Sequence, residues 1–170
     1  AAGGTYLPLV AGNRWTYAVE GGGTEVQVVD RELTVLARPA FAIVHRVDGI
    51  LVQEDYWSAA GGDVFFHGIY RPIEDFGRFY EPPLRAVDAP LAPGSTWAST
   101  AEVFILPDTS SIGMATFSFA ARSEGDIVVP AGTFHTFEIE EDSGALPRRW
   151  VALDLGTVRF GPDIRRGLLE

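Results

Sequence analysis

Short runs in which apolar and polar residues alternate make up most of the chain. Trp15, Tyr17 and Val19 recur at every second position, with Arg14 and Thr16 between them. A two-residue period predicts β-strands, and we expect about ten to eleven of them. The runs cover residues 13–20, 24–37, 40–48, 50–58, 63–70, 96–106, 112–124, 126–129, 133–141, 147–155 and 156–160. No run has an apolar period of 3.6 residues over a helical length, so the pattern predicts an all-β protein.

Glycine and proline mark the ends of these runs. The sequence has 19 Gly and 11 Pro. The pair Asp48-Gly49 is typical of a tight hairpin whose two turn residues need positive φ. Val26 and Val28 share one phase, whereas Leu33 and Val35 share another, which predicts a β-bulge near Asp30. We therefore expect one domain over residues 1–170, an antiparallel, strongly curved sheet that forms a half-open or closed barrel.

The segment 71–95 interrupts the alternation. It holds Arg71-Pro72, Pro82-Pro83, Pro90 and Pro93, and proline cannot donate a ladder hydrogen bond. The segment is also rich in large apolar side chains, which water would expose unfavourably. These are Phe76, Phe79, Tyr80 and Leu84. We expect a Pro-rich loop that acts as a lid over a cavity or as a plug at one end of the fold.

One sequence pattern occurs twice. Residues 8–15 read PLVAGNRW and residues 90–97 read PLAPGSTW. In both, we expect Pro and Gly to fix a turn that starts a strand, with Trp15 or Trp97 as its first deeply packed residue.

These motifs resemble a bacterial exported lipoprotein-like domain family of uncharacterised function. In that family a PLxxGxxWxY start is followed by PPL and PLxxGxxW segments, here at residues 82–84 and 90–97, and by a VPAGTF turn, here at residues 129–134. The chain departs from the family's GxGxV ending at Asp154, which stands in place of a glycine. The family is similar to the periplasmic lipoprotein carrier and receptor proteins (LolA/LolB-like), and the resemblance implies a curved sheet with an apolar interior.

The resemblance also implies export. The chain begins Ala-Ala-Gly-Gly without an initiator methionine, so we expect a signal peptide to have been removed. The expected location is the periplasm or the cell surface of the cell envelope, and a lipid anchor upstream of Ala1 is one way of attachment.

Charge and composition exclude several classes of protein. The formal net charge is -10, and all 13 basic residues are Arg. Binding to nucleic acid requires clustered cations, so we expect no nucleic-acid partner. Cys is absent, which leaves neither disulfides nor thiolate ligands. No apolar run approaches the roughly 20 residues of a transmembrane segment.

The residues that carry chemistry form no recognisable motif. His45, His67 and His135 lie on three separate predicted strands with no metal-ligand spacing. Glu54 and Asp55 are neighbours, so they face opposite sides of a strand and cannot both line one cavity. No serine lies in a G-x-S-x-G sequence. We expect no catalytic residue, no metal and no cofactor.

Aromatic residues give the more specific prediction. They make up 12% of the chain, and many cluster on the middle strands. The sequence predicts an apolar cavity that these side chains line or cover. The predicted ligand-binding residues are Trp57, Phe65, Phe66, His67, Tyr70, Phe76, Phe79, Tyr80, Phe104, Phe117 and Phe119.

The function we expect is non-catalytic: an exported domain that binds an apolar ligand, such as an acyl chain or lipid, or an envelope partner. One alternative is a small β-barrel enzyme of the cyclase or isomerase type. Inward-facing Glu54, Tyr56, His67 or Tyr70 would favour it. The other alternative is a structural protein-interaction domain without a ligand, which a solid interior would favour. The sequence leaves the oligomeric state open.

Overall fold

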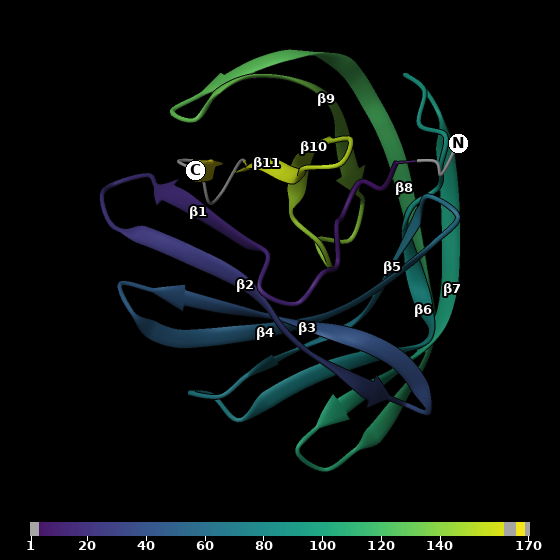
Figure 1. The fold of residues 1–170 in the computed structure, drawn as a ribbon. Helices are drawn as coiled ribbons and strands as arrows, with labels where there is room; N and C mark the ends of the chain where they lie inside the picture. Colours follow the sequence, from purple (N-terminus) through teal and green to yellow (C-terminus); the bar gives the residue numbers. More distant parts are fainter. Residues whose placement is uncertain (1–3, 162–165, 169–170) are drawn as a thin grey trace.

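The computed structural model describes residues 4–161 and 166–168, which form twelve β-strands in one closed barrel (Figure 1). The strands are β1 (Arg14–Val19), β2 (Thr24–Val35), β3 (Arg38–Val47), β4 (Ile50–Ala60), β5 (Asp63–Arg71), β6 (Phe76–Val87), β7 (Thr96–Leu106), β8 (Ser110–Val129), β9 (Gly132–Glu141), β10 (Arg148–Ala152), β11 (Gly156–Gly161) and β12 (Arg166–Leu168). This confirms the expected all-β class. In the described part of the chain, no helix has the length and apolarity needed to cross a membrane.

Neighbours along the chain are also neighbours in the sheet. Every pair is antiparallel, and the order runs from β2 to β12 without a crossover. The barrel closes where β1 pairs with β12, with Tyr17 opposite Leu168 and Val19 opposite Arg166. The count exceeds the expected ten to eleven because β6 and β12 were not anticipated, while residues 110–129 form one long strand instead of two.

The Pro-rich segment was expected to be a loop, but it contains the strand β6. β6 pairs with β7 only as far as Glu81, and the register between β5 and β6 shifts between Phe66 and Gly68. Pro82 and Pro83 therefore lie where neither ladder needs their missing N–H groups. About half of residues 71–95 thus belongs to the barrel wall, with a turn before β6 and a longer connection after it.

The two PLxxGxxW units form the same turn. Gly12 N donates to Val29 O and Gly94 N donates to Ala121 O, both at 2.8 Å. Each glycine has positive φ, +92° and +84° respectively. The indole of Trp15 donates to Leu155 O, and that of Trp97 donates to Arg85 O, each at 2.7 Å. The expected turn and strand start are confirmed at both sites, but Trp97 is only half-buried.

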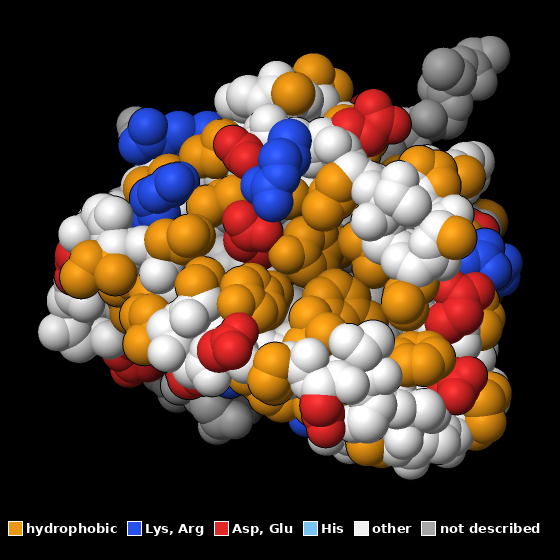
Figure 2. Space-filling model, turned by 90° about the horizontal axis from the view of Figure 1, so that it is seen from below, with side chains coloured by type: hydrophobic (Ala, Val, Ile, Leu, Met, Phe, Trp, Pro, Cys, Tyr) orange, Lys and Arg blue, Asp and Glu red, His pale blue; other side chains and the backbone are white. Residues whose placement is uncertain are grey.

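Apolar side chains pack on both sides of the sheet. The main core fills much of the barrel interior. A smaller cluster lies on the other side of β2 to β6, where Tyr56 stacks on Phe79 with ring centroids 5.6 Å apart. Seen from below the view of Figure 1, hydrophobic side chains gather in the middle of the face among acidic and basic ones (Figure 2). The smaller cluster comprises Leu33, Val35, Ala40, Ala42, Tyr56, Tyr70 and Phe79.

Candidate ligand-binding cavity

The barrel interior is not completely filled. A cavity of about 500 Å³ lies among strands β2 to β6 and β9 to β11. Its lining includes the exposed residues Arg71, Gly144 and Pro147, which lie where β5 and β9 end and β10 begins. This end of the barrel is therefore the mouth. Away from the mouth, the half-buried Tyr6 and Leu7 of the segment before β1 belong to the lining.

Much of the cavity wall is apolar. Trp57 and Phe66 stand side by side on β4 and β5, with ring centroids 4.8 Å apart. The other apolar lining residues come from many parts of the chain: Ile43, Val52, Val64, Ile69, Val87, Ala145, Leu146, Val151 and Phe160. The volume lies within the range of roughly 300–1,000 Å³ that is usual for small-molecule sites. The wall can bury an apolar body of small-molecule size.

One part of the wall is polar and charged. Nδ1 of His45 on β3 lies 2.9 Å from Glu25 Oε1 on β2, and Nε2 lies 2.9 Å from Asp55 Oδ2 on β4. Gln27 donates to Glu25 at 2.9 Å, and Gln53 donates to Asp55 at 2.6 Å. All five residues line the cavity. We call Glu25, His45 and Asp55 the acid–histidine–acid triad.

His45 is a cation at neutral pH. Burial by itself lowers the pKa of His45, but Asp55 and Glu25 together outweigh it and raise this pKa to about 9. The imidazolium therefore holds two carboxylates together and neutralises one of them. The triad links three adjacent strands inside the barrel.

A second buried cation lines the same cavity from another part of the sheet. Arg149 on β10 is 4% exposed and lines the cavity. Its Nη2 donates to Ala86 O at 2.8 Å, and its guanidinium lies 5.7 Å from the ring centroid of Trp57. Burial lowers the pKa of Arg149 to about 10, against the opposing effect of Glu141 and Asp55. Arg149 therefore remains charged at neutral pH.

The structure brings only part of the predicted site together. Trp57 and Phe66 line the cavity. Tyr80, Phe117 and Phe119 belong to the core, where Tyr80 links Phe66 to Phe117 through ring contacts of 5.7 and 5.2 Å. These three do not line the cavity, and neither do the other six predicted residues: Phe65, His67, Tyr70, Phe76, Phe79 and Phe104.

These remaining residues have other surroundings. Tyr70 and Phe79 belong to the cluster on the other side of the sheet, and Phe104 pairs with Phe79 across β6 and β7. The guanidinium of Arg85 lies 5.8 Å from the ring centroid of Phe65. Thus Phe66 faces inward while its neighbour Phe65 is covered by a β6 side chain, as their adjacency in a strand requires.

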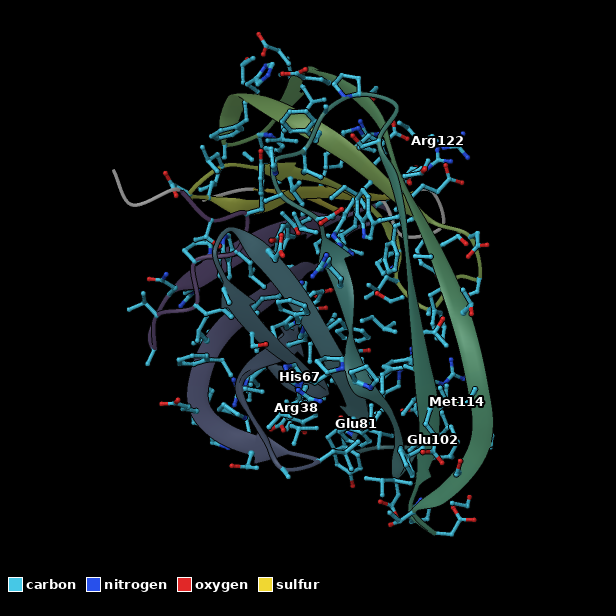
Figure 3. The ribbon with its side chains drawn as sticks, turned by 90° about the vertical axis from the view of Figure 1, so that its right-hand side faces the viewer. Arg38, His67, Glu81, Glu102, Met114 and Arg122 are labelled. Carbon is cyan, nitrogen blue, oxygen red and sulfur yellow. The ribbon has the colours of Figure 1, made fainter. Side chains whose placement is uncertain are left out.

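His67 belongs to a separate polar cluster. Its Nε2 lies 2.8 Å from Ser58 Oγ, and it is 2% exposed. Burial and the nearby Arg38 guanidinium lower the pKa of His67 to about 4, with Glu81 opposing them. Arg38 forms a two-pronged ion pair with Glu81, with its Nε and Nη2 at 2.9 and 2.7 Å from Oε1. Figure 3 places Arg38, His67 and Glu81 together, well apart from Arg122. None of the four lines the cavity.

The polar part of the cavity wall was not predicted from the sequence. Glu25 and Gln27 face inward on β2, whereas Val26 is half-buried, so the inward phase is the opposite of what hydrophobicity favours. Asp55 faces the cavity and Glu54 does not, as the alternation requires. The available signal was the two-residue spacing of polar side chains within a strand, which Glu25 and Gln27 show on β2 and Gln53 and Asp55 show on β4.

The fold and cavity define a class: an antiparallel meander barrel with a partly polar internal cavity. Two solved structures are similar to the chain. One is a "putative exported protein with YmcC-like fold" from Bacteroides fragilis, with TM-score 0.55 and 13% identity. The other is a "putative lipoprotein" from Parabacteroides distasonis, with TM-score 0.51 and 15% identity. Each alignment covers 100% of this chain and 99% of the other. No family model and no curated protein matches the sequence.

Proposed function

We propose that this chain is a non-catalytic exported domain that carries an apolar or amphipathic small molecule inside its barrel. The observation that carries the proposal is the cavity of about 500 Å³, which is lined by Trp57, Phe66, Val64 and Val151. A solid interior would favour the purely structural alternative, and the cavity argues against it. Export is supported by the names of the two similar structures, which describe an exported protein and a lipoprotein.

The enzyme alternative was expected to show itself by four particular side chains facing the cavity. The four side chains that would have indicated it are Glu54, Tyr56, His67 and Tyr70. None is among the lining residues of the cavity. Tyr56 and Tyr70 pack on the other side of the sheet, and the Tyr56 hydroxyl donates to Glu54 at 2.8 Å.

A titration with Nile red, a neutral apolar dye, tests the proposal. Saturable binding near one equivalent is expected, because the cavity offers one apolar site. Native mass spectrometry of the freshly purified protein identifies a ligand that remains bound through purification. Absence of saturable dye binding would overturn the proposal.

A larger side chain on the cavity wall should weaken ligand binding. Ile43 is buried on the cavity wall, so Ile43→Trp places a larger side chain in the space a ligand needs. Dye affinity should fall by roughly tenfold or more, since even one or two lost apolar contacts of a ligand cost about that much. The matched control is Val128→Trp, which adds the same side chain at a position that is 77% exposed. Equal dye binding by both variants, with both folded by circular dichroism, would contradict a site in the barrel.

A further inference from the structure

Arg149 is placed as a binding residue would be. Its backbone pairs with Ile139 on β9 and Phe160 on β11, so its position is fixed from both sides. The side chain enters the barrel, is 4% exposed and lines the cavity. Removing a guanidinium from water is costly unless another charge or several acceptors replace the lost hydration. The burial of the Arg149 guanidinium therefore needs an explanation.

The protein supplies Arg149 with few partners. A guanidinium has five N–H donors. In the described part of the chain, its one hydrogen bond goes to Ala86 O, and no carboxylate oxygen lies within 4.0 Å of it. Trp57 covers the guanidinium with its ring at 5.7 Å, which stabilises the cation without using its N–H donors.

The nearby carboxylates are already engaged. Asp55 accepts from Gln53 through Oδ1 and lies against His45 through Oδ2. Glu141 accepts from the backbone N–H of Ser143 at 2.9 Å and of Ala145 at 2.8 Å. These two acids attract Arg149 from a distance, but their oxygens are held by other donors. The remaining donors of the guanidinium are left for something inside the cavity.

We propose that Arg149 binds the carboxylate of a fatty-acid-like ligand whose chain lies along the apolar wall of the cavity. The inference rests on the carrier role proposed above and names the chemistry of its ligand. A planar guanidinium matches a carboxylate in two parallel hydrogen bonds, which are stronger than bonds between neutral groups. Trp57 and Phe66 lie beside the head group, and Val64, Val87 and Val151 offer surface to the chain.

A purely structural role for Arg149 is the competing explanation. Ala86 lies where the register between β5 and β6 shifts, between the pairs of Val64 with Val87 and Phe65 with Arg85. Arg149 would then serve only to satisfy the Ala86 carbonyl. That role affects folding but does not distinguish one ligand head group from another, so head-group selectivity separates the two.

The test displaces Nile red with three ligands of equal chain length: dodecanoate, 1-dodecanol and dodecyltrimethylammonium. The protein is used as wild type, Arg149→Met, Arg149→Lys and Arg122→Met. Arg122 is the matched control because it is an exposed arginine that pairs with Glu140 at 3.0 Å. Circular dichroism and the unfolding temperature of each variant are measured alongside.

The wild type should prefer dodecanoate to 1-dodecanol by roughly tenfold or more, since bonds to a charged group exceed neutral ones by about that factor. Arg149→Met should abolish this preference while 1-dodecanol still binds, Arg149→Lys should keep part of it, and Arg122→Met should keep all of it.

Equal binding of dodecanoate and 1-dodecanol by the wild type would overturn the inference and leave the carrier role intact. Preference for dodecyltrimethylammonium would overturn it in favour of the acidic groups of the triad. Failure of Nile red to bind the wild type saturably would overturn the carrier role itself. If Arg149→Met does not fold, the preference of the wild type and the partial preference of Arg149→Lys still decide the question.

Discussion

One glycine lets β5 and β6 approach each other. Gly68 has φ +153°, and a Cβ built there would lie 2.3 Å from the carbonyl oxygen of Arg78 and 2.8 Å from a ring carbon of Phe79. The neighbouring pair of Tyr56 and Phe79 depends on this close approach, since Gly68 is opposite both in the sheet. A side chain at this position would force the two backbones apart.

We predict that Gly68→Ala lowers the free energy of unfolding by about 2 kcal/mol or more, because the new methyl group clashes with backbone rather than with a flexible side chain. Chemical denaturation measures the effect. Gly125→Ala is the matched control, since a Cβ at Gly125 of β8 meets nothing within 4 Å. Equal stability of the two variants would show that the β5–β6 approach is not rigid.

At the scale of residues, turns and bulges were predictable from the sequence, because local backbone geometry determines them. Asp48 and Gly49 have the positive φ values of the expected hairpin turn, +48° and +84°. The bulge near Asp30 is confirmed by a register shift between Val29 and Arg31. The inward direction of Glu25 and Gln27 was not predictable, because a two-residue period defines two faces of a strand but not which of them faces a partly polar interior.

At the scale of elements, the segment before β1 depends on the turn between β10 and β11. Asp154 has φ +60° and replaces the glycine of the expected motif. Its carboxylate accepts from Thr5 N at 2.9 Å, and its own N–H donates to Thr5 O at 2.7 Å. This anchor holds Tyr6 against Phe137, with ring centroids 6.1 Å apart, and keeps Tyr6 at the cavity.

We predict that Asp154→Gly accelerates hydrogen exchange of the backbone amides of residues 5–7, because glycine accepts the positive φ but removes the carboxylate anchor. Asp154→Asn is the control, since asparagine tolerates the same backbone conformation and retains an acceptor oxygen. Exchange should be faster in the glycine variant only. Similar exchange in both variants would mean that the segment is held by Tyr6 and the backbone alone.

Not every strand could be predicted from the alternation of apolar and polar residues. Regular alternation predicted most strands but not β6, because the prolines inside it are typical of a loop. Pro82 and Pro83 are compatible with a strand only because the β6–β7 ladder ends at Glu81 and the β5 register shifts beside them. Both conditions depend on the partner strands, which the sequence of β6 does not contain.

At the scale of the whole molecule, the triad ties stability to pH. The folded pKa of His45 is about 9 and its ordinary value is 6.5. A raised pKa means that the folded state binds the proton more tightly, so this contribution is complete below pH 6.5 and is lost as the pH rises through 9. The groups that face the imidazole are Glu25 on β2 and Asp55 on β4.

We predict that the free energy of unfolding of the wild type falls between pH 6.5 and 9.5, and that His45→Gln lacks this fall. At pH 6.5 the variant should be less stable by about 3–5 kcal/mol, because two buried carboxylates lose their cation. His135→Gln is the control, since His135 is exposed between Glu124 and Asp126. A parallel pH profile for wild type and His45→Gln would refute the assignment.

The class of fold was predictable for the whole molecule, but the nature of its interior was predictable only in part. Alternation and turn residues indicated a curved all-β sheet, and the aromatic content indicated a cavity. The buried charged groups inside come from β2, β3, β4, β9 and β10. Their meeting depends on barrel closure and register, which no local pattern encodes.

The seam between β1 and β12 has a consequence for biosynthesis. Every other strand pair joins neighbours along the chain, so hairpins can form in the order in which they leave the ribosome. The free side of β1 finds its partner only when residues 166–168 have been made. A translation product that stops before them keeps two open strand edges, and such edges invite association with other chains.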